Sequence, residues 1–396
     1  MNFYSSLSSV FLAALSLTTS AATKMPLDCN RGASLTRALE HAKPGETIVF
    51  TGNCNGPISI TQDGLGLQGQ GTAVIDGQKQ TAVTIRGAQN VSLSNLEVRN
   101  GINGILADAQ AQVKLTNVTI EDNAVIGILL QNNSGAVFKD VKTRNNGVHG
   151  LDAENTSTVT VNGAFSAETN GVFGININAG SSFTLNNAQV TAQKNLLGIQ
   201  LGTGASAFLG DPASSITAAN NVSTGLTVVS GSQLVSFGGK INATGNGRHG
   251  VSVNSKAGLD LDAASVLESA NNDGNGVQLA ESSVMTLFNT TAFSGQPGST
   301  TLKTHDNGAN GIAVLLGSNL TSVNQVALFS QNNAGTGVLA DNGNAITLLN
   351  ATVTGNTPDI ALTFGARSDI RKSTVGTVVC DPNILSRGDV TCPAVP

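Results

Sequence analysis

Apolar and polar positions alternate in a short segment that recurs along this chain at intervals of 23 to 27 residues, with one interval of 35. Each segment starts at a glycine followed by Ile, Leu or Val. After Gly150, for example, Leu151 and Ala153 are expected to face inward and Asp152 and Glu154 outward. The first and third positions after the glycine are apolar in all ten segments, as in strands that bury one face. The ten glycines are Gly104, Gly127, Gly150, Gly174, Gly198, Gly225, Gly250, Gly276, Gly311 and Gly337. A fixed period with fixed chemistry indicates a repeat architecture of stacked coils.

An asparagine stands four residues before nine of these glycines: Asn100, Asn123, Asn146, Asn170, Asn221, Asn246, Asn272, Asn307 and Asn333. In the remaining repeat that position is Lys194, and Asn195 comes one place later. Asparagine tolerates left-handed backbone and bonds nearby main-chain groups. We therefore expect a stacked asparagine column that joins neighbouring coils.

The repeats continue toward both ends of the chain. Residues 34–42 predict a short helix with Ser34 as N-cap, stopped by Pro44-Gly45, and such a helix covers the open edge of a β-stack. Strand-like segments that begin at Ile58, Val83 and Ile360 add further coils. The pattern therefore predicts an all-β solenoid of about 13 coils with an N-terminal capping helix.

The Asn-x-x-x-Gly-[Ile/Leu/Val] repeats, together with the leader that runs from Leu35 to Ala42-Lys43-Pro44-Gly45-Glu46-Thr47-Ile48, resemble those of the right-handed parallel β-helix proteins of the pectate-lyase-like superfamily. The resemblance covers residues 27–380 or so. It implies a single-stranded right-handed parallel β-helix whose ligands lie along an outward strand face. It also implies an extracellular polysaccharide as the partner.

The N-terminus reads as a secretory signal. Val10 to Leu17 is apolar and small residues lead to Ala22, although no Lys or Arg precedes the apolar run. We assign residues 1–22 to the signal and 23–396 to one β-helix domain. No later segment reaches the ~18 apolar residues that a membrane span needs. The expected location is secreted, extracellular or periplasmic.

Only 11% of residues are charged and the net charge is −5, which argues against a nucleic-acid partner. We expect a monomer. Four cysteines allow three pairings. The local one, Cys29–Cys54 and Cys380–Cys392, would close each end of the solenoid. The cysteine spacing does not suit a metal, and we expect neither metal nor cofactor.

The outward positions of the middle coils are polar and form a strip ~25 Å long. Asp152 and Glu154 are the acidic pair on it, and His149 lies beside them. Two carboxylates on one strand face fit acid and base roles at a glycosidic bond, and these three residues are the candidate catalytic group. The alternative is two solvated carboxylates on a strand. The candidate substrate-binding residues are Asn176, Asn178, Lys194, Gln200, Arg248, His249, Ser252 and Asn254.

Three activities of similar proteins lack their residues here. The run Gly247-Arg248-His249-Gly250-Val251-Ser252 resembles a polygalacturonase stretch, but the preceding coil, at Gly225, carries no aspartate pair. The Asp-Pro-His-Asp run of mannuronan epimerases is absent, since Asp211-Pro212 continues as Ala213-Ser214. No acidic cluster with a nearby Arg suits a calcium-dependent pectate lyase.

Two functions remain open at this point. The first is an enzyme that cleaves glycosidic bonds of an extracellular polysaccharide by hydrolysis or elimination. The second is a non-catalytic secreted binder of polysaccharide or cell-surface glycan, or an adhesin. Low charge and the absence of Trp support the second, and a fold that hosts many functions does not decide between them.

Overall fold

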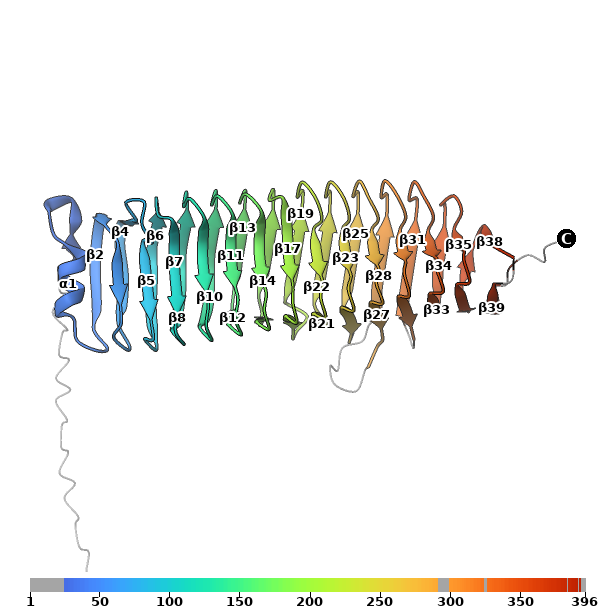
Figure 1. Ribbon diagram of the computed structural model, residues 1–396, viewed down its shortest axis with the longest axis horizontal. Helices are drawn as coiled ribbons and strands as arrows, with labels where there is room; N and C mark the ends of the chain where they lie inside the picture. Colours follow the sequence, from blue (N-terminus) through green and yellow to red (C-terminus); the bar gives the residue numbers. More distant parts are fainter. Residues whose placement is uncertain (1–24, 291–298, 324–325, 383, 391, 393–396) are drawn as a thin grey trace, which may run out of the picture.

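The computed structural model describes residues 25–290, 299–323, 326–382, 384–390 and 392, which wind into one parallel β-solenoid (Figure 1). The predicted signal, residues 1–22, lies outside the described residues. Each coil in the middle of the stack carries three strands, one on each of three faces.

The first face, called the site face below, is a 14-stranded parallel sheet that contains the strand after each repeat glycine. Its strands are β3 (Ile58–Ile60), β5 (Val83–Arg86), β7 (Asn103–Asp108), β9 (Ile126–Leu130), β11 (His149–Ala153), β14 (Phe173–Ile177), β17 (Leu197–Leu201), β20 (Leu226–Val228), β23 (Val251–Val253), β26 (Val277–Leu279), β29 (Ile312–Val314), β32 (Val338–Ala340), β35 (Ile360–Leu362) and β38 (Val378–Cys380).

The coil starts predicted at Ile58, Val83 and Ile360 are confirmed as β3, β5 and β35. The count of about 13 coils misses one, because β38 pairs with β35 in the register Ile360↔Val378, and this interval is shorter than the repeat. The solenoid thus has 14 strands on the site face.

The other two faces belong to one 25-stranded sheet, since long bent strands cover both faces in the first coils. Strand β1 (Leu27–Asp28) leads into these long strands, which are β2 (Thr47–Asn55), β4 (Gly66–Asp76), β6 (Val91–Arg99), β8 (Gln112–Glu121) and β10 (Gly135–Arg144).

After β10, separate strands form each face, because β10 pairs with both β12 and β13. The second face contains β12 (Thr158–Val161), β15 (Ser182–Leu185), β18 (Ser206–Leu209), β21 (Gln233–Phe237), β24 (Gly258–Asp262), β27 (Val284–Leu287), β30 (Asn319–Ser322), β33 (Ala345–Leu349), β36 (Arg367–Arg371) and β39 (Leu385–Gly388). The third face contains β13 (Ala164–Glu168), β16 (Gln189–Gln193), β19 (Ser215–Ala219), β22 (Lys240–Thr244), β25 (Val266–Ala270), β28 (Thr300–His305), β31 (Val326–Gln331), β34 (Ala351–Thr354) and β37 (Thr374–Val375).

The core is the continuous interior of the solenoid. The predicted inward positions are buried in every repeat, as Leu151 and Ala153 illustrate. Aromatic rings fill part of this interior, where Phe138 and Phe165 are buried with ring centroids 5.1 Å apart. Each coil buries its apolar residues only by stacking on its neighbours, so the core runs along the whole solenoid and has no single centre.

The expected asparagine column is present as a ladder of ten buried residues: Asn123, Asn146, Asn170, Asn195, Asn221, Asn246, Asn272, Asn307, Asn333 and Asn356. The backbone N–H and Nδ2 of each asparagine donate to the Oδ1 of the asparagine in the next coil. The ladder ends at the Asp359 carboxylate, whose Oδ1 accepts from Asn356.

Membership in the ladder differs from the sequence prediction at three places, and the first is the addition of Asn356 after Asn333. Asn195 takes the ladder position in its coil, and Lys194 precedes it at φ 57°. Asn100 is outside the ladder, because Gly101 donates to Asn123 in its place and Asn100 instead bonds Asp76. Hydrogen-bond register, which counting from the glycine cannot see, sets the ladder position.

The repeat glycines are explained by this ladder. A Cβ added at Gly198 would lie 2.3 Å from the carbonyl oxygen of Gly225 and 2.7 Å from Nδ2 of Asn221. The same two neighbours, the next repeat glycine and a ladder asparagine, crowd Gly127 and Gly174. Glycine is therefore required because the ladder occupies the space where a side chain would start.

We predict that Gly198→Ala lowers the free energy of unfolding by about 3 kcal/mol, since the backbone on which the clash falls cannot yield cheaply. Chemical denaturation measures the effect. Gly231→Ala is the control. Its Cβ meets nothing within 4 Å and suffers only the strain of φ +72°, so its cost should stay near 1 kcal/mol. Equal costs for the two variants would contradict this explanation.

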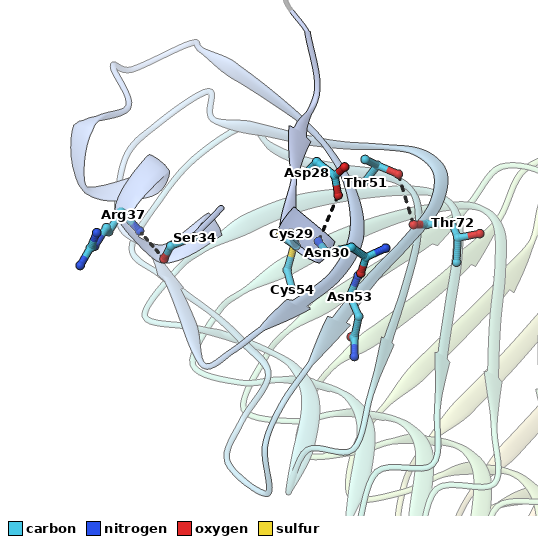
Figure 2. The surroundings of a disulfide bond; sticks show 9 residues. All are labelled: Asp28, Cys29, Asn30, Ser34, Arg37, Thr51, Asn53, Cys54 and Thr72. Atoms are coloured by element: carbon cyan, nitrogen blue, oxygen red, sulfur yellow. Dashed lines mark hydrogen bonds between the residues drawn. A yellow bond between two sulfur atoms is a disulfide. The ribbon is translucent and has the colours of Figure 1, made fainter. Parts of the chain in front are cut away.

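The N-terminal end is closed by a small cap (Figure 2). The chain enters through a 3-10 turn (Cys29–Arg31) and helix α1 (Leu35–His41), where the Ser34 Oγ accepts from the Arg37 N–H as predicted. Leu35 and Leu39 of α1 are buried against the first coil. The Cys29–Cys54 disulfide ties the 3-10 turn to β2.

The Cys380–Cys392 disulfide closes the other end, so the structure contains the local pairing. Such bonds persist in oxidising compartments. None of the helices in the described ranges is long and apolar enough to cross a membrane.

Candidate functional site

The polar strip predicted from the sequence lies on the site face. Six consecutive coils place Asp152, Asn176, Gln200, Thr227, Ser252 and Gln278 side by side in register. The strip is bounded by Leu129 at one end and Ala313 at the other. At ~4.8 Å per coil it is ~24 Å long.

Side-chain amides link the first three residues of the strip. Nδ2 of Asn176 donates to Oδ1 of Asp152 over 2.9 Å, and Nε2 of Gln200 donates to Oδ1 of Asn176 over 3.2 Å. This chain of hydrogen bonds fixes the Asp152 carboxyl group on rigid strands. Precise placement on strands rather than loops is what a reactive group needs.

Asp152 is outward-facing yet only 8% exposed. Burial, and then the neighbouring Glu154 charge, raise its pKa from 3.8 to about 6, while the hydrogen bond from Asn176 opposes the rise. The alternative of two solvated carboxylates therefore does not describe Asp152. Glu154 follows the end of β11 and is half-buried. A carboxyl group that titrates near neutrality can transfer protons.

His149 lies at the start of β11, on the edge of the strip. Its Nδ1 accepts the Phe173 N–H over 3.4 Å, which leaves the other ring nitrogen, Nε2, to carry the proton of the neutral ring. Burial lowers the pKa of His149. His149 is thus placed as a neutral hydrogen-bond donor at the start of β11, three residues before Asp152.

Phe173 was missed by the sequence reasoning. It aligns with His149 in the next coil, and the two ring centroids are 5.1 Å apart. Ile126 and Leu197 extend this apolar edge on either side. The available signal was position, because Phe173 precedes Gly174 as His149 precedes Gly150. An aromatic ring beside a polar strip suits the C–H face of a sugar.

The second half of the strip carries Ser252 and Asn254. Nδ2 of Asn254 donates to the Ser252 Oγ over 2.7 Å, and Oδ1 of Asn254 is buried without a partner among the described side chains. This oxygen is an acceptor that a ligand hydroxyl would satisfy. Asn178, by contrast, accepts from its own turn, at the Ala179 N–H.

His249, Arg248 and Lys194 are placed differently from the strip. His249 is buried and its Nδ1 accepts the Asn275 N–H over 3.1 Å; burial and the Arg248 charge lower its pKa to about 4. His249 therefore links its coil to the next one through this hydrogen bond. Arg248 and Lys194 are exposed in the turns before β23 and β17. These two predicted binding residues therefore lie outside the polar strip that begins at Asp152.

A groove of about 730 Å³ lies beside the site face. Asp76, Lys79, Asn100 and Asp122 line it along the turns that precede β5 to β9, and it ends at Gly147, two residues before His149. Asp152 does not line this groove. Within the described residues, no three His, Cys, Asp or Glu side chains group as a metal site.

Asp211, which begins the run compared with the epimerases, is structural. Its carboxylate accepts from the backbone of Asn187, Ala213 and Ser214, and these bonds lower its pKa against the effect of burial. It belongs to a turn on the far side of the coil from β17 and β20.

The protein-family model described as the right-handed β-helix region matches residues 73–222 of this chain. No curated protein sequence matches the chain. Among solved structures, the A-module of the mannuronan C-5 epimerase AlgE4 of Azotobacter vinelandii is similar, with 14% identity and a TM-score of 0.50 over 90% of this chain and 93% of that one.

Two further structures align over most of their length with lower scores. The A-module of AlgE6 from the same organism has 16% identity and a TM-score of 0.43, with 91% and 93% covered. An alginate lyase from Paenibacillus sp. str. FPU-7 has 12% identity and a TM-score of 0.33, with 92% and 97% covered. The repeat, the three-faced coil and the family model agree on the fold: residues 73–222 match the right-handed β-helix region, and the coils before and after them continue the same parallel stack.

Proposed function

We propose that this chain is a secreted protein that cleaves glycosidic bonds of an extracellular polysaccharide on the site face. The observation that carries the proposal is Asp152, a buried carboxyl group held by Asn176 and raised in pKa to about 6, with Glu154 beside it. Two carboxyl groups in unlike environments are the usual arrangement for acid and base roles. A polysaccharide as the substrate class is supported by the similar fold of a mannuronan C-5 epimerase module.

In this proposal, protonated Asp152 donates its proton to the glycosidic oxygen as the bond to the sugar carbon breaks. The Glu154 carboxylate accepts a proton, either from the water that adds to that carbon or from the sugar ring carbon in an elimination. His149 donates a hydrogen bond from Nε2, and Phe173 supports the apolar face of a sugar. Asn176, Gln200, Ser252 and Asn254 bind hydroxyl groups of neighbouring units.

The test is release of new reducing ends by residues 23–396 from a panel of acidic and neutral polysaccharides. A product that absorbs ultraviolet light through a new carbon–carbon double bond identifies elimination, and its absence identifies hydrolysis. Because Asp152 acts as the acid, we predict that kcat/KM falls about tenfold per pH unit above about 6. A rate that rises through this range would contradict the assigned role.

The second candidate is a glycan-binding protein or adhesin. It is favoured by the composition of the strip, where Asn176, Gln200, Thr227, Ser252 and Gln278 offer only amides and hydroxyls. Such groups bind sugars without chemistry. Retention on immobilised glycan with no product across the panel would select this function.

A further inference from the structure

Three partly exposed phenylalanines lie on the second face, two, three and five coils after the coil that carries Asp152. Phe208 of β18 is 40% exposed, and its ring centroid is 5.8 Å from that of Phe237 in the next coil. Phe288 follows β27 and is half-buried. We call Phe208, Phe237 and Phe288 the phenylalanine platform.

These rings do not follow the pattern of their own face. The outward column that contains Phe208 has Thr160 and Thr184 in the preceding coils and Thr286 and Thr321 in later ones. Threonine is the ordinary outward residue of such a strand. An aromatic ring at this position forgoes the ~2 kcal/mol that burial in the core would contribute, as Phe138 and Phe165 show by packing inside.

Polar groups accompany the platform in register. Phe208 aligns with Val235, and Val235 with Asp260 in the following coil. Nε2 of Gln233 donates to Oδ2 of Asp260 over 2.6 Å, and its amide covers Gly258, where a Cβ would lie 2.5 Å from its oxygen. The Asp260 side chain is thus held at the edge of the platform.

Two carboxyl groups, those of Asp260 and Asp262, lie beside the platform. Asp262 aligns with Phe237, and its two oxygens accept from the backbone N–H and the hydroxyl of Thr290. Burial raises the pKa of Asp260, hydrogen bonds from Thr286 and Gln233 oppose the rise, and the Asp262 charge adds to it. No Lys or Arg is among the groups that shift the pKa of Asp260. A polyanionic glycan would be repelled here.

We propose that the phenylalanine platform is a second glycan-binding site, which holds a neutral polysaccharide strand without chemical change. The rings contact the C–H faces of the sugars, and Asp260 and Gln233 bond their hydroxyl groups, the combination of apolar surface and few placed polar groups that ligand sites use. It is on a different sheet from the strip, so it goes beyond the proposed reaction and does not depend on it.

Affinity electrophoresis of residues 23–396 tests the site, with soluble xyloglucan, mixed-linkage β-glucan and galactomannan as neutral probes and polygalacturonate and alginate as acidic ones. We expect retardation by at least one neutral probe. Phe208→Ala and Asp260→Asn should each weaken it about tenfold, equivalent to losing one good contact. Circular dichroism and denaturation confirm that each variant folds.

Phe364→Ala is the matched control, because Phe364 is 70% exposed and lies in a distant coil. It should leave retardation unchanged. Asp152→Asn should also leave it unchanged, whereas Phe208→Ala should leave turnover of a short soluble oligosaccharide unchanged, which separates this site from the proposed reaction. No retardation by any neutral probe, stronger retardation by the acidic ones, or equal effects of Phe208→Ala and Phe364→Ala would overturn the proposal.

Discussion

Asp152→Asn is expected to reduce product formation at least 100-fold and to leave glycan binding within a factor of two or so. The amide keeps the shape of the carboxyl group and an oxygen that accepts from Asn176, but it has no proton to give at neutral pH. The measurement is kcat and KM on the polysaccharide that the panel identifies. The expected signature is a loss in kcat with little change in KM.

Asp108→Asn provides the control on the same face. Asp108 lies at the end of β7, where bonds from Asn132 and Ala109 outweigh burial and lower its pKa, with a contribution from Arg86. We place it outside the reaction, so its replacement should leave kcat unchanged. Equal losses in the two variants would show that general changes in charge on this face, and not Asp152, determine the rate.

Asp152→Asn should also change the stability of the protein, and this effect does not depend on activity. A carboxyl pKa raised from 3.8 to about 6 means that the folded state holds the proton more tightly than the unfolded chain does. The cost in folding free energy of ionising buried Asp152 is absent below pH 3.8, grows as the pH rises and is complete above about 6. It amounts to roughly 3 kcal/mol at most. Asp152→Asn should therefore be more stable than the parent at pH 8 and equally stable near pH 3.

Asn221→Ala is expected to lower the free energy of unfolding by about 4 kcal/mol. Its backbone N–H and Nδ2 donate to Oδ1 of Asn246, and Nδ2 also donates to the Ala192 carbonyl. Its own Oδ1 accepts twice from Asn195. Truncation leaves buried donors and an acceptor unpaired, and each such group costs about 1–3 kcal/mol.

Denaturant unfolding followed by circular dichroism measures this loss. Asn242→Ala is the control, since Asn242 is half-buried on the outer side of β22 and lies outside the ladder. Its cost should stay below about 0.5 kcal/mol. Because neighbouring ladder residues share hydrogen bonds, Asn221→Ala and Asn246→Ala should cost less together than the sum of the two. An additive pair would argue against a coupled ladder.

The repeat itself could be predicted because its physical causes are local. Glycine and the apolar positions after it recur in ten coils, with an asparagine before the glycine in each, and each contributes to the same stacking contact. The helix at 34–42, the local disulfide pairing and the inward columns followed from the same local signals, and the structure confirms them.

The sequence by itself also determined the candidate strip, since alternation assigns each strand residue to a side. What only the tertiary structure decided is the environment of those side chains. Asp152 looks solvated in the sequence and is 8% exposed in the coil stack, Phe173 reaches His149 only through coil-to-coil register, and His249 faces a backbone N–H of the following coil. The reason is physical: a period fixes which side of a strand a residue takes, whereas burial and pKa depend on neighbours 24 or 26 residues away, brought within contact by stacking.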